Sequence, residues 1–334
     1  MEELLFYMEV GVYTVLIKKI ILNNVKVRKA YPWLCWCLLI LLTACEANKR
    51  TRPDFTDTPT SGSITISADI SFKPVIDEQI KVFESNNPGT KINVQYKPEA
   101  DCVKDLWNDS IRMVISTIAL TESEKATLAD SMNVVVDQLP IARDAIAVIV
   151  NPMSPDSLFD MNEIKSILTG TYSRPLIPVF DGIKTTSTIR YILDSVLRGE
   201  TLNPAAVAAS TSDSVINYVA QTPNAVGFIG VSWIGNPEDS KQRSFLKKVK
   251  IAYLKGNNSD EKYILPVQAN LYDRKYPMTR DLTYILKETH VGLGNGFASF
   301  LRGEIGQLIF KRAYLMPGRR FFIFRPVRLN EDSI

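Results

Sequence analysis

Two short turns rich in hydroxyl groups carry the residues best suited to bind a small ligand. Ser71 lies just before one expected helix, and Thr185–Thr188 lie just before another. The first N–H groups of a helix lack intrahelical partners and lie at the positive end of its dipole, so they favour anions. Each turn alone is explained equally well as an ordinary N-cap. An anion site is therefore a prediction about the two turns together.

Residues suited to catalysis are few. His290 is the single histidine, no G-x-S-x-G or H-E-x-x-H motif accompanies it, and a surface or capping role explains it. Three of the four cysteines lie within the first 45 residues, leaving Cys102 alone, which excludes a disulfide framework and a cysteine-based zinc site. Glu99 and Asp101 form the only suggestive acidic pair, and a solvated loop explains them better. We expect neither an enzyme nor a bound cofactor.

The charge balance argues against a nucleic-acid partner. The chain has 39 Lys and Arg against 36 Asp and Glu, a net charge of +3. Most of that small excess falls within residues 1–44, so the rest of the chain is nearly neutral. Nucleic-acid binding needs a clustered basic face, and the short basic runs 247–250 and 319–320 are better explained as solvated edges.

The N-terminal segment has the pattern of a bacterial lipoprotein signal peptide. Basic residues between Lys26 and Lys29 precede the apolar run Trp33–Leu42, which is too short to span a bilayer. Leu42-Thr43-Ala44-Cys45 follows, and it resembles a lipobox. We predict a signal peptide over 1–44, lipidation of Cys45, and a flexible tether over 45–62, which is rich in Thr, Pro, Asp and Ser. A buried helix that happens to end in cysteine is the alternative.

Strands and helices are expected to alternate after the tether. Alternation predicts strands at Ser63–Ala68, Lys91–Tyr96 and Ile111–Ser116, and helical spacing predicts a helix between Phe72 and Asn87. Further strands are expected at 134–136, 145–150, 178–180, 226–229 and 249–254, and an amphipathic helix over Phe297–Phe310. This order predicts an α/β fold with a largely parallel sheet.

Six short motifs, in order, match one family. Over roughly 63–327 the chain resembles the phosphate-binding proteins that feed ABC importers. The matching segments are Ala68–Pro74, Ile141–Val148 with its exit at Asn151-Pro152, Phe180–Thr188, Pro223–Gly230, Tyr276–Arg280 and Gly296–Gln307.

The resemblance implies a two-lobed, periplasmic-binding-protein-like fold of type II, each lobe a mostly parallel sheet flanked by helices. Lobe 1 would be 63–151 plus 268–327, and lobe 2 would be 152–267. The ligand would lie between the lobes, which close about chain crossings near Val150–Pro152 and Val267–Tyr272. The implied ligand-binding residues are Ser71, Phe72, Arg112, Thr117, Asp144, Lys184, Thr186, Ser187 and Thr188.

Several positions depart from the family pattern. The family's Ser- and Gly-rich loop is replaced by Glu99–Cys102, whose carboxylates would oppose an anion unless they point away. Arg112 stands where the family carries an acid that accepts a proton from hydrogen phosphate. We therefore expect Arg112 to supply positive charge to the anion and to admit fully ionised anions. Alternatively, Arg112 pairs with Asp101 or Asp144.

The predicted function is an envelope lipoprotein, anchored in a membrane by its N-terminal lipid and facing the periplasm or exterior. It would bind phosphate or a related oxyanion, with an importer permease as a possible partner. The alternative is a binding or sensor lipoprotein of the same fold, for another small ligand and with no role in transport.

Overall fold

The computed structural model describes residues 56–182, 186–236, 238–257 and 262–319, all within one compact unit, Phe55–Ile334. The predicted signal peptide, Cys45, most of the predicted tether and Lys184 lie outside the described residues. Within the described part of the chain, no helix is both long and apolar enough to cross a membrane.

Asp57, within the range predicted for the tether, lies against the folded unit. Asp57 is buried, and its Oδ2 accepts a hydrogen bond from the backbone N–H of Leu293 at 2.6 Å. Its Oδ1 lies 3.1 Å from Nε2 of His290. Because the Asp57 carboxylate satisfies the N-terminus of a helix, this part of the chain is fixed to the folded unit.

The main sheet is parallel on its flanks and antiparallel in its middle. The first three strands in its order are mutually parallel, as are the last three, while the two central strands run antiparallel to their neighbours. The order is β2 (Thr90–Lys97), β1 (Gly62–Asp69), β3 (Ile111–Ser116), β12 (Thr279–Glu288), β4 (Val135–Val150), β8 (Ala225–Gly230), β6 (Ile177–Asp181) and β7 (Val207–Ala209).

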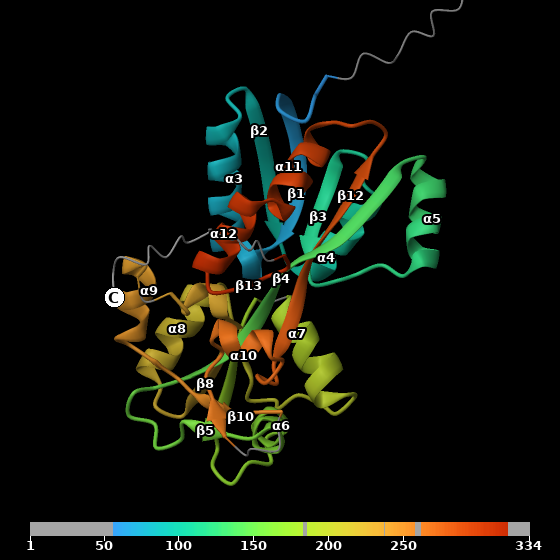
Figure 1. The fold of residues 1–334 in the computed structure, drawn as a ribbon. Helices are drawn as coiled ribbons and strands as arrows, with labels where there is room; N and C mark the ends of the chain where they lie inside the picture. Colours follow the sequence, from blue (N-terminus) through green and yellow to red (C-terminus); the bar gives the residue numbers. More distant parts are fainter. Residues whose placement is uncertain (1–55, 183–185, 237, 258–261, 320–334) are drawn as a thin grey trace, which may run out of the picture. The chain divides into compact units, whose positions relative to one another are not determined.

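Strand β4 pairs with β12 along its first part and with β8 along its second part (Figure 1). Val135–Ala145 pairs with β12, and Ile146–Val150 pairs with β8. We call β2, β1, β3, β12 and the first part of β4 the first half-sheet, and the rest the second half-sheet. The expectation of separate strands at 134–136 and 145–150 was wrong, because the ladder to β12 continues past Pro140 through a register shift.

Helices cover both faces of the first half-sheet (Figure 1). One face packs against α3 (Lys73–Asn86), α11 (Leu293–Arg302) and α12 (Glu304–Arg312). The other packs against α4 (Glu99–Lys104) and α5 (Glu122–Met132). The sequence Thr121-Glu122-Ser123-Glu124 is that of a capping box, and it forms one at the start of α5. The buried residues of α3 include Val75, Ile76, Ile80 and Phe83, as its helical spacing predicted.

The second half-sheet is also covered on both faces. Helix α6 (Met161–Thr169) and the π-helical turn η4 (Ile192–Leu197) pack on one face. Helices α8 (Ser212–Gln221) and α9 (Ser240–Leu246) pack on the other. The wholly apolar run Ala145–Val150 lies between these two layers and is fully buried, as expected of a central strand.

The predicted helix Phe297–Phe310 is two helices. Gly303 has extended backbone angles and separates α11 from α12. The break turns the second helix, so Gly306 and Gln307 are buried while Ile305 and Leu308 are about half exposed. A single amphipathic helix over this range places Ile305 and Leu308 on its apolar face, and that prediction is wrong.

Candidate functional site

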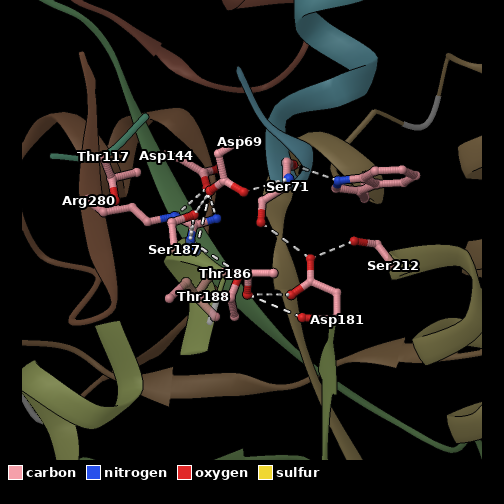
Figure 2. A network of polar contacts seen from close by, with 12 residues as sticks. Asp69, Ser71, Thr117, Asp144, Asp181, Thr186, Ser187, Thr188, Ser212 and Arg280 are labelled. Atoms are coloured by element: carbon pink, nitrogen blue, oxygen red, sulfur yellow. Dashed lines mark hydrogen bonds and ion pairs between the residues drawn. The ribbon is translucent and has the colours of Figure 1, made fainter. Parts of the chain in front are cut away.

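The carboxyl ends of β1 and β6 bring the two hydroxyl-rich turns together. Strand β1 runs through the turn η2 (Ile70–Phe72) into α3, and β6 is followed by the turn into α7 (Ser187–Tyr191), which continues directly into η4. Thr186 is the N-cap of α7. Ser71 and the turn 186–188 are fully buried, and Figure 2 shows them facing one another.

Asp69 joins the two turns. Its Oδ1 accepts a hydrogen bond from the N–H of Ser71 at 3.1 Å. Its Oδ2 accepts one from the N–H of Ser187 at 3.3 Å and another from the Ser187 hydroxyl. One carboxylate thus accepts a backbone N–H at the start of η2 and another at the start of α7, which is the role that an anion would take.

Asp181, at the end of β6, holds the opposite side of the network (Figure 2). It accepts hydrogen bonds from the hydroxyls of Ser212 at 2.9 Å, Thr186 at 3.3 Å and Ser71 at 3.4 Å. The indole N–H of Trp233 donates to the carbonyl of Ser71 at 2.7 Å. All of these groups are buried, so their hydrogen bonds form in a low-dielectric environment, where each bond is electrostatically stronger than in water.

Arg280 supplies the positive charge. It is the second residue of β12, and only 6% of it is exposed. Its Nε lies 3.0 Å from Asp144 Oδ2, while Nη1 donates to the hydroxyls of Ser187 at 2.8 Å and Thr188 at 3.2 Å. The guanidinium also lies over the Phe72 ring, 4.9 Å from its centroid. Arg280 therefore links both half-sheets.

Three buried carboxylates surround this one guanidinium. The pKa of Asp69 is raised to about 7, mainly by burial and next by the Glu99 carboxylate, while Arg280 lowers it. Burial also raises the pKa of Asp144 and of Asp181, again against the effect of Arg280. Part of the network can therefore hold a proton near neutral pH. Among the described residues, no group of His, Cys, Asp and Glu side chains is arranged to hold a metal ion.

Glu99 is buried at the start of α4, rather than lying in a solvated loop. It accepts hydrogen bonds from Thr117 N at 2.8 Å and Thr117 Oγ1 at 2.7 Å, and Arg190 Nε lies 2.5 Å from its other oxygen. The second carboxylate expected there, Asp101, pairs with Lys104 at 2.8 Å. The acidic residues of this segment are thus neutralised by their own partners.

Thr117 lies beside Arg280, on the side away from Asp181 (Figure 2). There Thr117, Arg190 and Arg280 line a groove of about 400 Å³. A smaller pocket of about 220 Å³ lies beyond Asp181, against Lys73 and Trp233. A larger one of about 560 Å³ lies against α12 and contains none of the network residues.

The structure does not bring Arg112 to this network. Its Nη2 lies 2.5 Å from Glu288 and 3.5 Å from Asp57, so it pairs with neither Asp101 nor Asp144. The reason is strand direction. Arg112 is the second residue of β3, whereas the network lies near the other end of that strand. Since β12 runs antiparallel to β3, the start of β12 lies beside the end of β3. Arg280 therefore occupies the place expected for Arg112.

Most of the other predicted site residues lie close to Arg280. Ser71, Phe72, Asp144, Thr186, Ser187 and Thr188 come together around Arg280, with Thr117 beside them. Sequence reasoning missed four members of the network. They are Asp69, Asp181, Arg280 and Ser212. The first three are charged residues near strand ends inside the quoted motifs, and this position was the signal that could have identified them.

The fold is that of a known superfamily. Residues 54–304 match the model of the PBP superfamily domain, and the chain belongs to that superfamily. It is 23% identical over 256 residues to the phosphate-binding protein PstS of Bacillus subtilis, covering 73% of this chain and 76% of that one.

Solved structures agree on the fold. A protein from Clostridium perfringens, described as a phosphate ABC transporter substrate-binding protein with bound phosphate, has a TM-score of 0.62 at 19% identity. An ABC-type phosphate transport receptor from Vibrio cholerae has a TM-score of 0.58 at 18% identity. Each match covers 77% of this chain and all of the other. The predicted resemblance and fold class are confirmed.

Proposed function

We propose that the chain is a solute-binding protein whose ligand is a small protonated oxyanion, with hydrogen phosphate as the first candidate. The observation that carries this proposal is Arg280, a buried guanidinium surrounded by the hydroxyls of Ser187 and Thr188 and by the N-termini of α3 and α7. A guanidinium fork donates to two oxygens of a tetrahedral anion at once. The names of the phosphate-binding relatives support the same ligand class.

The carboxylates give the proposed site its selectivity. Asp69 and Asp181 accept hydrogen bonds only, so in their ionised form they require a ligand that carries a proton. Hydrogen phosphate has such a proton at neutral pH, whereas sulfate has none. The expected preference is thus the reverse of the one inferred from Arg112, because two carboxylates that the sequence analysis did not include, Asp69 and Asp181, lie beside the guanidinium of Arg280.

Binding requires the two half-sheets to separate locally. In the structure the N–H of Ser187 already donates to Asp69, and the acidic, hydroxyl and guanidinium groups of the network are all buried. We propose a hinge in β4 and β12, with the ligand replacing the bond between Asp69 and Ser187. The strand pairing of β4 changes between Ala145 and Ile146, which supports a crossing near this point. The lobe ranges 63–151 plus 268–327, and 152–267, stay a prediction.

Titration calorimetry on the purified protein tests the ligand. Phosphate is expected to bind, and at a hundred times its dissociation constant to stabilise the fold by about 2.7 kcal/mol, raising Tm by roughly 5–10 °C. Sulfate is expected to bind at least tenfold more weakly. Ser187→Ala removes a hydrogen bond to a charged ligand and should weaken phosphate binding by roughly 10- to 100-fold.

Ser195→Ala is the matched control, because Ser195 is exposed on the following turns of the same helix. It should leave the affinity for phosphate unchanged. No heat and no thermal shift with phosphate, or equal affinities for phosphate and sulfate, would contradict the proposed ligand.

We also propose that Cys45 is lipidated and holds the protein at the cell envelope, facing the periplasm or exterior. The basic, apolar, Leu42-Thr43-Ala44-Cys45 order supports this, as do the solute-binding relatives. Cys45→Ser is expected to leave the protein unprocessed or to release it from the membrane fraction. Mass spectrometry that finds residues 1–44 intact in the mature wild-type protein would refute the assignment.

An importer permease is the proposed partner, because two of the structural relatives are named as parts of phosphate ABC transport systems. We propose binding without catalysis. A ligand sensor with no permease is the alternative, and a pull-down of membrane proteins with the lipidated chain distinguishes the two.

A further inference from the structure

The groove beside Arg280 is larger than a bare oxyanion needs. It has a volume of about 400 Å³ and is lined by residues of both half-sheets, among them Thr117, Ala119, Arg190, Tyr191, Arg280 and Thr283. Sites for organic ligands commonly have volumes of about 300–1,000 Å³. An ion of five heavy atoms at the turn 186–188 would leave most of this groove for something else.

The walls of the groove are fixed and polar. Arg190 is held by its bond to Glu99 and donates from Nη2 to Thr117 Oγ1 at 2.8 Å. The Tyr191 hydroxyl donates to the carbonyl of Pro277 at 3.1 Å, which fixes the ring. Thr283 contributes a buried hydroxyl group. These groups supply donors and acceptors in a preorganised arrangement, as a ligand with several hydroxyl groups requires.

The groove also offers two guanidinium groups to an anionic ligand. Arg190 and Arg280 both line it, and the only acid among its lining residues is Asp281, which is paired with Arg143 at 2.7 and 3.2 Å. Because Arg190 is paired with Glu99 and Arg280 with Asp144, they supply hydrogen-bond donors rather than net charge. Arg280 connects these donors to the oxyanion site.

We propose that the ligand is a small organic phosphate. Its phosphate group binds Arg280 and the turn 186–188, and its hydroxyl-bearing part, of about the size of glycerol, fills the groove between Thr117 and Tyr191. This inference rests on the proposed oxyanion function and names its substrate class. The phosphate group of such an ester carries the proton that the ionised carboxylates require only near or below its second pKa of about 6, so its binding is compared with that of inorganic phosphate at pH 6.

Calorimetry on the full chain, with inorganic phosphate and with glycerol 3-phosphate, tests the inference. Glycerol 3-phosphate is expected to bind at least tenfold more tightly. If inorganic phosphate binds equally well or better, the inference is overturned while the oxyanion function stands. If neither compound binds, the oxyanion function fails, and the inference fails with it.

A variant at the rim of the groove tests the location. Ala119 is exposed and makes none of the contacts assigned to the phosphate group. Ala119→Trp fills the groove and should weaken glycerol 3-phosphate binding at least tenfold, with less than a threefold change for inorganic phosphate. Ala205→Trp, at an exposed alanine outside the groove, should alter neither affinity. Unchanged binding of glycerol 3-phosphate to Ala119→Trp would overturn the proposal.

Discussion

Replacing Arg280 by alanine is expected to lower the free energy of unfolding by about 3–5 kcal/mol and to abolish oxyanion binding. Only 3% of the Arg280 side chain is exposed, and its partner Asp144 is fully buried. Removing one member of a buried ion pair leaves the other charge desolvated and uncompensated, which costs far more than losing an exposed pair. Asp69 and Asp181 would lose the same neighbouring cation. Urea denaturation followed by tryptophan fluorescence measures the loss.

Arg143→Ala is the matched control. Arg143 and Asp281 pair on the same two strands, but their side chains are 22% and 46% exposed, so the expected loss is below about 1 kcal/mol. Combining Arg280→Ala with Asp144→Asn should restore part of the stability, because the uncompensated charge is then gone. Equal losses for Arg280→Ala and Arg143→Ala would show that the buried charges do not determine the stability of this region.

The second large effect concerns pH. The pKa of Asp69 is raised from 3.8 to about 7, so between these values the folded protein binds a proton that the unfolded chain has released. The associated stability is fully present below about pH 4 and is lost as pH rises to 7. At 1.36 kcal/mol per pKa unit, this group alone accounts for a loss of about 4 kcal/mol. The raised pKa values of Asp144 and Asp181 act in the same direction.

Asp69→Asn is therefore expected to flatten the decline in unfolding free energy between pH 4.5 and 7.5, and to be more stable than the wild type at pH 7.5. An asparagine can still accept from Ser71 and can donate to Ser187. Asp281→Asn, at a half-exposed carboxylate, should leave the pH dependence as it is. If Asp69→Asn lowers stability equally at both ends of the range, ionisation of Asp69 is not the cause of the decline.

Local signals predicted much of the fold. The capping boxes at Thr121 and Asp160 and the apolar face of α3 are formed by neighbouring residues, and all three are present in the structure. The break at Gly303 was missed because the apolar spacing in the sequence continues across it. A glycine inside a predicted helix disfavours the helical conformation, and this was a signal for the break.

The sequence predicted the site residues that lie within a single turn, but not those that the sheet brings together from different strands. Arg112 and Arg280 are each the second residue of an apolar strand, and nothing local separates them. What separates them is that β12 runs antiparallel to β3, with Thr283 opposite Ser116 and Leu286 opposite Met113. Strand direction is a property of the whole sheet, and one sequence without its relatives does not reveal it.

Strand β4 contributes to both half-sheets and therefore determines how the proposed hinge motion spreads through the protein. Asp144, which holds Arg280, immediately precedes the point where β4 changes partners, between Ala145 and Ile146. A ligand bound to Arg280 would thus act close to the proposed hinge, whereas the loops at the ends of the molecule lie far from it. A rotation about the hinge that shifts the guanidinium by a fraction of an ångström would displace these loops by more, because displacement grows with distance from the hinge. The proposed membrane partner would distinguish the ligand-bound from the ligand-free protein at these loops.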